Sequence, residues 1–358
     1  MADWRSTMTQ TFEFYLVDPG TWRDVKKLTT ITSGSITRDS DVETRGSATF
    51  DITGDLGECY VRAYLVTIQN GLRELHPLGT FLVQTPSSSF DGKVTTAQVD
   101  GYTPLIELKE KMPPLGFSLL KDDDLQNDIL ASAYNLMTDN MRAPVVSASG
   151  KDKLTGDFIA NADDTWLTFC SDLVKNAKHT IELDELGRVI FAPEQELDSL
   201  QPVWTYDDDN SSILYPDISL NHDLFGIPNV VEVVYSGSGT SAPIRCTVEN
   251  TDPNSPVSIT NRGRRILYRD TNPSFSGEPT ISQVEEYAAR LLKALSTIEY
   301  TVNYTHGYCP VRVGDCVRLN YRRAGIVGVK AKVIRQTISC TPGCPVSETA
   351  IFTSKLWG

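Results

Sequence analysis

Short stretches in the first hundred residues alternate apolar and polar side chains, and turn-forming residues separate them. The clearest are Thr11–Val17, Ser35–Arg38, Ser47–Thr53, Tyr60–Ile68, Gly79–Gln84 and Thr95–Tyr102. A period of two predicts strands with one buried face. Gly, Pro, Asn and Asp supply turns between them, as in Asp18-Pro19-Gly20. Many short strands of this kind are typical of a sandwich or barrel, so we predict a first β-barrel over residues 1–110, completed by residues 201–222.

The pattern then changes to helical spacing. Residues 124–137 place apolar side chains three and four positions apart, and the carboxylates of Asp122–Asp124 suit the N-terminus of a helix there. The apolar positions of this face are Leu125, Ile129, Leu130, Ala133, Leu136 and Met137. A second amphipathic helix is predicted over residues 163–178, followed by a hairpin over residues 180–191. Residues 111–200 are therefore predicted to form a small inserted α+β domain.

Alternating stretches return after Pro202, and a single helical pattern interrupts them. The predicted strands are 203–206, 217–220, 229–235, 244–249, 299–304, 311–321, 327–338 and 349–354. The helix covers residues 282–295, with Ser282 in the N-cap position and Glu285 three residues later, as in a capping box. We predict a second β-barrel over residues 223–358 with this helix packed against it. The fold class is thus mainly β, with two tandem β-barrels and an α+β insert.

Composition and charge narrow the range of functions. A chain of 358 residues exceeds the size of one comfortable core, which predicts two or three domains. The net charge of −13 argues against specific nucleic-acid binding, because that requires a basic face. No apolar run approaches the ~18–20 residues that cross a bilayer, so we expect no membrane span. The N-terminal residues lack the apolar segment of a secretory signal, and we expect the chain to fold in a cytoplasm.

Common catalytic motifs are absent from the sequence. The four histidines are His76, His179, His222 and His306. None belongs to a metalloprotease motif, and neither a nucleophile elbow nor a phosphate-binding loop occurs. The acidic runs Asp122–Asp124 and Asp207–Asp209 lack calcium-loop spacing, and we interpret them as a helix cap and a solvated loop. We therefore predict that the chain is not an enzyme and has no catalytic residue.

A glycine-rich segment, Gly237-Ser238-Gly239, follows a predicted strand, as a dinucleotide-binding turn would. Such a turn must open a helix whose N-terminus holds the pyrophosphate. Pro243 and a strand-like run follow instead, and Ala242 stands at the third glycine position. We interpret the segment as a hairpin loop and predict no cofactor.

The seven cysteines are an odd number, and a reducing compartment makes structural disulfides improbable. Four of them lie near the C-terminus: Cys309, Cys316, Cys340 and Cys344. Their spacing differs from the paired C-x2-C knuckles of structural zinc sites. Metal ligation and burial as small apolar side chains both remain open, and we expect the second, with no metal site.

The order of several segments resembles one family, the hub proteins at the distal end of bacteriophage tails and related contractile injection machines. Ile31–Arg38 followed by Arg45–Asp51 resembles the opening of that family's first barrel. Asp164–Cys170 followed by Glu185–Phe191 is similar to its inserted domain. Leu224–Asp270 and Val311–Leu319 resemble its second barrel. The resemblance covers nearly the whole chain.

The resemblance implies a structural function in the virion. Three copies would form a pseudo-sixfold ring that joins the tail tube to the tip, assembled in the host bacterial cytoplasm. The implied partners are the distal tail or tail-tube protein, the tape-measure protein, and tip, spike or fibre proteins. Cell-wall cleavage and host recognition are then expected on another polypeptide. Two alternatives stay open: a tail-associated cell-wall hydrolase, and a receptor- or carbohydrate-binding β module.

Overall fold

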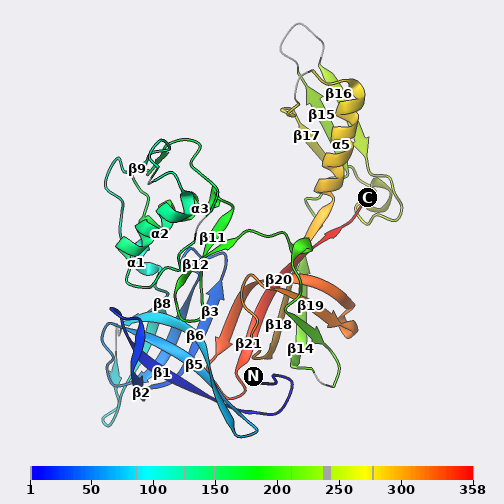
Figure 1. Ribbon diagram of the computed structural model, residues 1–358. Coiled ribbons are helices and arrows are strands. Elements are labelled where there is room, and N and C mark those ends of the chain that lie inside the picture. Colours follow the sequence, from blue (N-terminus) through cyan, green and yellow to red (C-terminus); the bar gives the residue numbers. More distant parts are fainter. Residues whose placement is uncertain are drawn as a thin grey trace. The chain divides into compact units, whose positions relative to one another are not determined.

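The computed structural model describes residues 2–84, 88–124, 126–148, 150–210, 212–236, 243–275 and 278–357. Leu125, Ala242 and the segment 237–239, which the sequence picked out, lie outside these ranges. The chain forms two compact units: unit 1 comprises Met1–Ile218 and Asn303–Ala350, and unit 2 comprises Ser219–Val302 and Ile351–Gly358. Strands dominate the chain (Figure 1), which confirms the prediction of a mainly β fold.

The N-terminal half of unit 1 is an antiparallel sheet. Its strands are β1 (Thr9–Asp18), β2 (Arg23–Leu28), β3 (Ile31–Asp39), β4 (Gly46–Thr53), β5 (Cys59–Gln69), β6 (Leu72–Gln84), β7 (Ser89–Phe90) and β8 (Thr95–Tyr102). Their order is β3-β4-β8-β6-β5-β1-β2, and β7 pairs with β8. In β4 the alternating residues Ala48, Phe50 and Ile52 are buried. They join one core with side chains from β1, β3, β5, β6 and β8, so the sheet curves around a single interior.

Strand β2 was not predicted from the sequence. Its residues, Arg-Asp-Val-Lys-Lys-Leu, lack alternating apolar positions, and nearly all of them are exposed. The strand pairs with β1 and forms an outer edge of the sheet, where lysine and arginine side chains suit contact with solvent. Edge position, rather than burial, therefore explains why a polar segment adopts strand conformation here.

The sheet continues into a C-terminal half. Its elements are β13 (Trp204–Asp207), β14 (Leu214–His222), β18 (Thr297–Gly307), β19 (Cys316–Tyr321), η2 (Arg322–Ala324), β20 (Ile326–Ser339) and β21 (Pro345–Lys355). The junction is the antiparallel pairing of β20 with β3, and the order beyond it is β14-β18-β21-β20, with β19 also paired to β20. Strand β13 pairs in parallel with β19. This differs from our expectation that residues 201–222 complete the first barrel, because their ladder partners lie in the C-terminal half.

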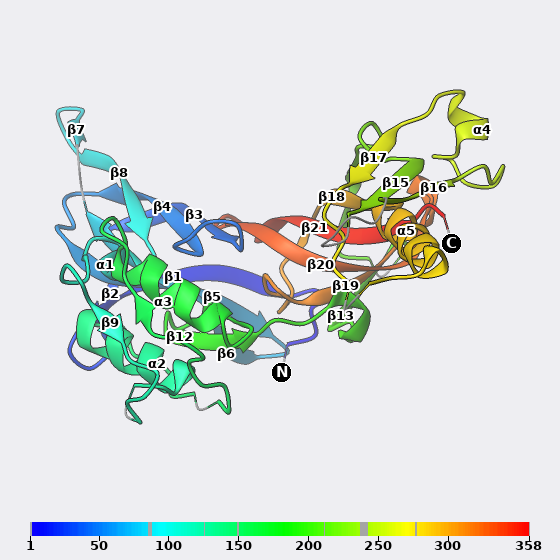
Figure 2. The same cartoon turned by 90° about the horizontal axis from the view of Figure 1, so that it is seen from above.

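Between the two halves lies the α+β insert, as predicted. Its elements are α1 (Ile106–Lys109), β9 (Ser118–Leu119), α2 (Ile129–Asn140), β10 (Phe158–Ile159), α3 (Trp166–Lys175), β11 (His179–Leu183), β12 (Val189–Pro193) and η1 (Leu197–Ser199). Figures 1 and 2 show the helices packed together beside the β11–β12 hairpin. The Asp128 side chain caps α2 by accepting from the Ala131 N–H at 3.0 Å. The helix therefore starts later than the run Asp122–Asp124, which we had expected to cap it.

A single backbone carbonyl fixes the β11–β12 turn to the N-terminal sheet. The carbonyl oxygen of Leu186 accepts hydrogen bonds from Trp22 Nε1 at 2.8 Å, Thr80 Oγ1 at 2.8 Å and Arg62 Nη2 at 3.2 Å. Arg62 also bonds Thr80 Oγ1 and Asp24 Oδ1, each at 2.8 Å. We call these residues the Leu186 cluster. Because three donors converge on one acceptor, the insert has a defined position within unit 1.

Gly187 permits this close approach. Its φ of +73° is a left-handed conformation, and a Cβ atom at this position would lie 2.7 Å from Thr80 Cβ. Trp22 itself has a φ of 55°, which is uncommon for a bulky residue. The docking contact therefore depends on unusual backbone conformations on both sides.

Unit 2 contains its own small sheet and core. Its elements are β15 (Val230–Tyr235), β16 (Ile244–Glu249), α4 (Ile259–Arg262), β17 (Leu267–Asp270) and α5 (Ile281–Leu295). The sheet order is β16-β15-β17, and α5 buries Val284, Ala288 and Leu292 against β15 and β16. We had predicted one barrel over residues 223–358. The strands of residues 223–358 instead belong to two sheets, this small one and the large sheet of unit 1. The helix α5 packs on the small sheet.

The cap of α5 also differs from the prediction. Thr280, not Ser282, is the N-cap: its side chain accepts from the Gln283 N–H, and Gln283 accepts from the Thr280 N–H, completing the capping box. The pattern of a hydroxyl followed three residues later by Gln or Glu occurs twice in this segment. The extended backbone at Thr280 decides between them.

Candidate functional site

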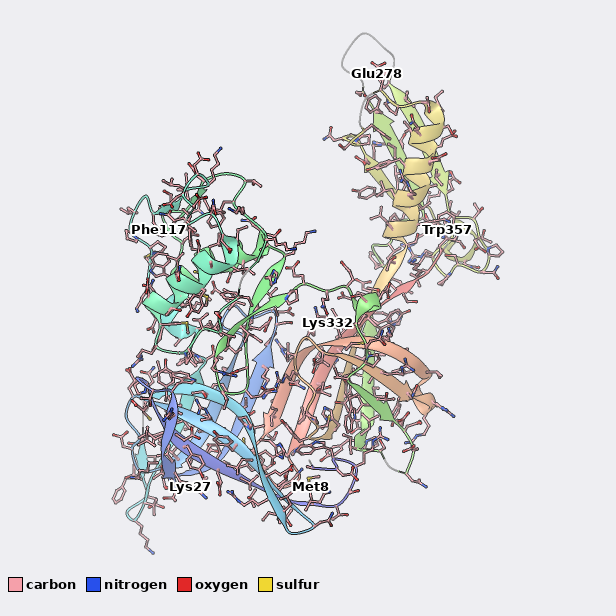
Figure 3. The ribbon with its side chains drawn as sticks, viewed as in Figure 1. Met8, Lys27, Phe117, Glu278, Lys332 and Trp357 are labelled. Atoms are coloured by element: carbon pink, nitrogen blue, oxygen red, sulfur yellow. The ribbon has the colours of Figure 1, made fainter. Side chains whose placement is uncertain are left out.

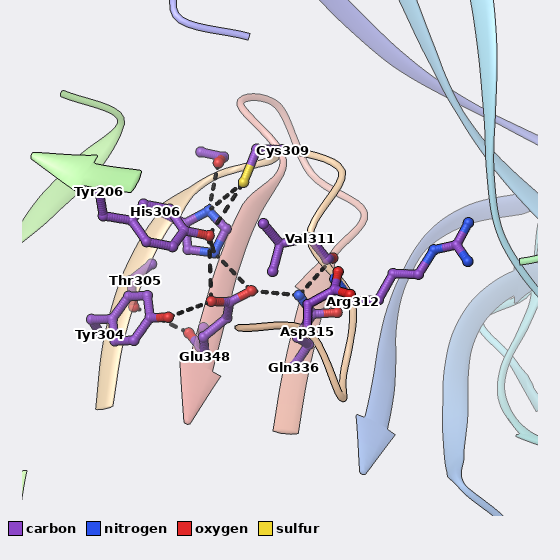
Figure 4. Close-up of polar contacts among 12 residues, drawn as sticks. Tyr206, Tyr304, Thr305, His306, Cys309, Val311, Arg312, Asp315, Gln336 and Glu348 are labelled. Atoms are coloured by element: carbon purple, nitrogen blue, oxygen red, sulfur yellow. Dashed lines mark hydrogen bonds and ion pairs between the residues drawn. The ribbon is translucent and has the colours of Figure 1, made fainter. Parts of the chain in front are cut away.

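A group of buried polar and ionisable side chains lies together in the C-terminal half of unit 1. Four strands and one loop contribute to it, and Figure 4 shows its members. The members are Tyr206 on β13, Tyr304 and His306 on β18, Cys309 in the following loop, Gln336 on β20 and Glu348 on β21. We call this set the His306 cluster. Every member is buried.

Glu348 is the centre of the cluster. His306 Nε2 lies 3.2 Å from Glu348 Oε1, and neither side chain has any exposed surface. Tyr304 donates its hydroxyl to Glu348 Oε2 at 2.6 Å, and Gln336 donates Nε2 to Oε1. Gln336 also donates to the Val311 carbonyl at 2.8 Å, which ties the loop to the strands. The carboxylate is thus surrounded by donors, the condition under which a buried charge is tolerated.

The two charged groups stabilise each other's ionised form. Burial alone would lower the pKa of His306, but the Glu348 carboxylate outweighs it and raises the pKa to about 10. Burial alone would raise the pKa of Glu348, but the His306 imidazolium outweighs it, and the pKa is lowered. The pair is therefore an imidazolium and a carboxylate at neutral pH.

A thiol, an imidazole and a carboxylate together are the parts of a cysteine nucleophile with its base. Cys309 Sγ lies 3.9 Å from His306 Nδ1. That nitrogen donates to the Gly307 carbonyl at 2.6 Å, and Nε2 faces Glu348, so both ring nitrogens carry protons. The imidazolium has no free lone pair with which to take the thiol proton, and Cys309 is 1 % exposed. In this conformation the cluster is a structural ion pair, not an activated nucleophile.

The four C-terminal cysteines are dispersed rather than gathered. Cys309 touches the Tyr206 hydroxyl at 3.2 Å, Cys316 lies on β19, and Cys340 and Cys344 belong to the core of the N-terminal half. Burial raises the pKa of the Cys340 thiol to about 12. Within the described ranges, no three His, Cys, Asp or Glu side chains are arranged to hold a metal ion. All four thiols are buried.

The remaining histidines of the sequence are separate from the cluster. His76 packs edge-on against Trp4, and His179 opens β11. The ring of His222 lies 5.0 Å from that of Tyr300, tilted by 38°. Sequence reasoning treated His306 as structural but missed its partner. Glu348 lies between Val346 and Ala350, two buried residues of the same strand face. A carboxylate at an inward position of an alternating strand is the signal that could have predicted a buried ion pair.

One shallow depression of about 440 Å³ lies on the N-terminal sheet. Its rim is mostly hydroxyl and amide side chains, including Thr53, Thr96 and Gln98. The one carboxylate, Asp51, accepts from Ser33 at 2.6 Å and from Gln98 at 3.1 Å. No nucleophile and base meet among its described lining residues. Elsewhere, none of the described helices is both long and apolar enough to span a membrane.

Known structures share this fold over nearly the whole of this chain. A tail protein from Neisseria meningitidis MC58 aligns at 12 % identity and a TM-score of 0.59, covering 96 % of this chain and 97 % of its own. The 43 kDa tail protein of prophage MuSo2 from Shewanella oneidensis aligns at 10 % identity and 0.57, covering 95 % and 98 %. A chain of the Francisella PdpA-VgrG complex aligns at 9 % identity and 0.54, covering 97 % of this chain and 58 % of its own.

Neither family models nor curated protein sequences match the chain. The likeness therefore lies in the fold rather than in the sequence. The fold is that of the phage tail proteins, and the resemblance inferred from the order of the sequence motifs is confirmed at that level.

Proposed function

We propose that this chain is a structural hub protein of a phage or phage-derived tail. In this role three copies form a pseudo-sixfold ring that joins the tail tube to the tip. The observation that carries the proposal is the alignment with the Neisseria meningitidis tail protein over almost the full length of both chains. An architectural role accords with the sealed His306 cluster, whose buried charges serve the fold.

The organisation of unit 1 supports a ring. Its sheet has two halves, so three copies would supply six. The sheet ends in β2 and β14, and neither outer edge has a partner strand among the described residues. Because β2 is rich in lysine and suits contact with solvent, the β14 edge is the one that we expect a neighbouring subunit to cover. Distal tail, tape-measure and tip or fibre proteins are the proposed partners, and assembly in the host cytoplasm precedes incorporation in the virion.

Light scattering on the purified chain tests the proposal. The expected result is a particle of three 39.6 kDa chains, alone or with tail partners, and a ring in electron micrographs. A strict monomer under all these conditions would count decisively against the ring. Incubation with bacterial cell walls tests the competing hydrolase function, and release of soluble muropeptides would replace our proposal with that one.

A further inference from the structure

A short segment before β1 lies between the two halves of unit 1. In Figures 1 and 2 the N-terminus lies where the two halves meet, and Figure 3 labels Met8 just after this segment. Residues 2–5 belong to no helix or strand. We call residues 2–5 the strap, because their contacts reach both halves.

On one side the strap binds the β5–β6 hairpin of the N-terminal half. Asp3 and Gln69 form a reciprocal pair. The Asp3 N–H donates to Gln69 Oε1 at 2.8 Å, and Gln69 Nε2 donates to the Asp3 carbonyl at 3.0 Å. The Trp4 ring packs edge-on against His76, with 4.8 Å between the ring centroids. The strap is thus attached to both strands of the hairpin, since Gln69 ends β5 and His76 lies on β6.

On the other side the strap binds the C-terminal half. The Trp4 ring also packs edge-on against Tyr308, which follows β18, with 5.1 Å between the centroids. Arg5 Nη2 donates to the Thr205 carbonyl of β13 at 2.9 Å, and its guanidinium lies over the Trp204 ring. Two consecutive side chains therefore join β13 and the loop after β18 to the β5–β6 hairpin.

Asp3 also stabilises the turn that carries these two side chains. Its Oδ1 accepts from the Arg5 N–H at 3.1 Å, and its Oδ2 accepts from the Ser6 hydroxyl at 2.5 Å. The Ser6 N–H donates to the Asp3 carbonyl at 3.0 Å. An aspartate that bonds the backbone two residues later holds a turn locally. The shape of the strap therefore depends on its own residues as well as on the surfaces that it contacts.

The attachment of the strap is limited and largely in solvent. Its hydrogen bonds to Gln69 and Thr205 are exposed. Arg5 Nη2 is 3.7 Å from Asp207 Oδ2, and the Arg5 side chain is 40 % exposed, so this ion pair contributes little. Trp4 is the anchor, because it is partly buried and packs against the core of the N-terminal half.

The two halves are also joined without the strap. Ser35–Asp39 of β3 pair with Arg335–Ser339 of β20. Ile338 and Val346, from strands of the C-terminal half, are buried in the core of the N-terminal half. Removal of the strap therefore leaves the main junction of unit 1 intact.

We propose that the strap is a releasable clasp. When it is closed, it holds β13 and the loop after β18 against the β5–β6 hairpin. When it is open, these two segments are freed, and the rest of unit 1 stays folded because the β20–β3 ladder and the shared core remain. The inference concerns a single chain and does not depend on the ring of the proposed function.

Trypsin tests the release, because the strap contains a cleavage site after Arg5. Proteolysis requires the bound turn to open, so the rate of cleavage reports the open state. Trp4→Ala removes the anchor and keeps the site, and we expect it to accelerate cleavage after Arg5 by about 10-fold or more. Mass spectrometry of the product that begins at Ser6 measures the rate. Phe90→Ala, which removes an exposed aromatic side chain of β7, is the matched control and should leave the rate unchanged.

Amide hydrogen exchange of Trp4→Ala identifies what opening frees. We expect residues 203–208 and 305–311 to exchange faster than in the wild-type chain, while residues 335–339 of β20 stay protected in both. Arg5→Ala, which keeps the anchor, should accelerate exchange in residues 203–208 alone.

Three results would overturn the inference. Equal cleavage rates in Trp4→Ala and the wild-type chain would show that Trp4 does not hold the strap closed. Unchanged exchange in residues 203–208 and 305–311 would show that the strap does not restrain these segments. Loss of protection in β20 together with β13 would show that the strap belongs to one cooperative unit with the main junction and is not released separately.

Discussion

Unit 1 holds two buried polar clusters that work by different chemistry. In the His306 cluster, one charge compensates another, and Tyr304 and Gln336 saturate the carboxylate of Glu348. In the Leu186 cluster, three donors share one neutral backbone carbonyl. The first joins strands of the C-terminal half, and the second joins the insert to the N-terminal half. Both clusters contain a charged pair, since Arg62 of the second also pairs with Asp24 at 2.8 Å. The difference is that the first is centred on a carboxylate and the second on a neutral carbonyl in a turn.

Of the changes considered, removal of the His306 side chain is expected to lower the stability of the folded chain most. His306→Leu leaves the Glu348 carboxylate buried without its countercharge, which we expect to lower the free energy of unfolding of unit 1 by about 3–5 kcal/mol. Urea unfolding followed by circular dichroism measures it. His222→Leu, which removes an exposed histidine, is the control and should cost far less.

The double variant His306→Leu with Glu348→Leu sharpens the comparison. An apolar pair of similar volume replaces both charges, so at least half of the lost stability should return. If the double variant is less stable than the single one, the compensation of charge is not what stabilises this cluster.

Gly187→Ala is expected to have the next largest effect. The new methyl group meets Thr80 in a left-handed backbone conformation, and we expect a cost of about 2–3 kcal/mol together with faster proteolysis of the insert. Gly57→Ala is the matched control, because its φ is +64° and nothing lies within 4 Å of the added Cβ. Equal costs at the two glycines would show that the turn does not depend on close docking.

Alkaline pH should weaken the His306 cluster and spare the Leu186 cluster. The pKa of His306 is raised to about 10 in the folded chain, so its stabilisation is complete below the ordinary histidine pKa of about 6.5 and is lost as the pH rises toward 10. Between pH 7 and 8.5 we expect unit 1 to lose about 1–2 kcal/mol. A pH series of urea denaturations measures the slope. The slope should vanish in the double variant with two leucines, and its persistence there would assign the proton to another group.

The smallest effect is expected in unit 2, outside both clusters. Thr280→Ala removes the side-chain cap of α5 and should cost about 1 kcal/mol, measured by thermal unfolding. Ser282→Ala is the control, because that residue lies inside the helix rather than at its cap. A larger cost at Ser282 than at Thr280 would restore the cap that the sequence had suggested.

Local patterns in the sequence predicted much of the fold and little of the clusters. Alternation located strands such as β4 and β5, and helical spacing located α3 and α5, because both report burial of one face. These patterns do not report which distant segments pair. The alternation in β13 is compatible with either half of the sheet, and its parallel pairing with β19 depends on contacts between segments far apart in the sequence. Likewise, Glu348 follows His306 by 42 residues and matches no motif. The order of the motifs carried more information than any motif alone.

The acceptor at Leu186 has a consequence for how such proteins diverge. Every residue type has a backbone carbonyl, so no substitution at position 186 deletes it. Selection for this contact would fall instead on the donors at 22, 62 and 80 and on the glycine at 187. Position 186 is therefore expected to vary in side chain among proteins of this fold while its carbonyl remains at the centre of the contact. A comparison that scores only amino-acid identity would overlook it.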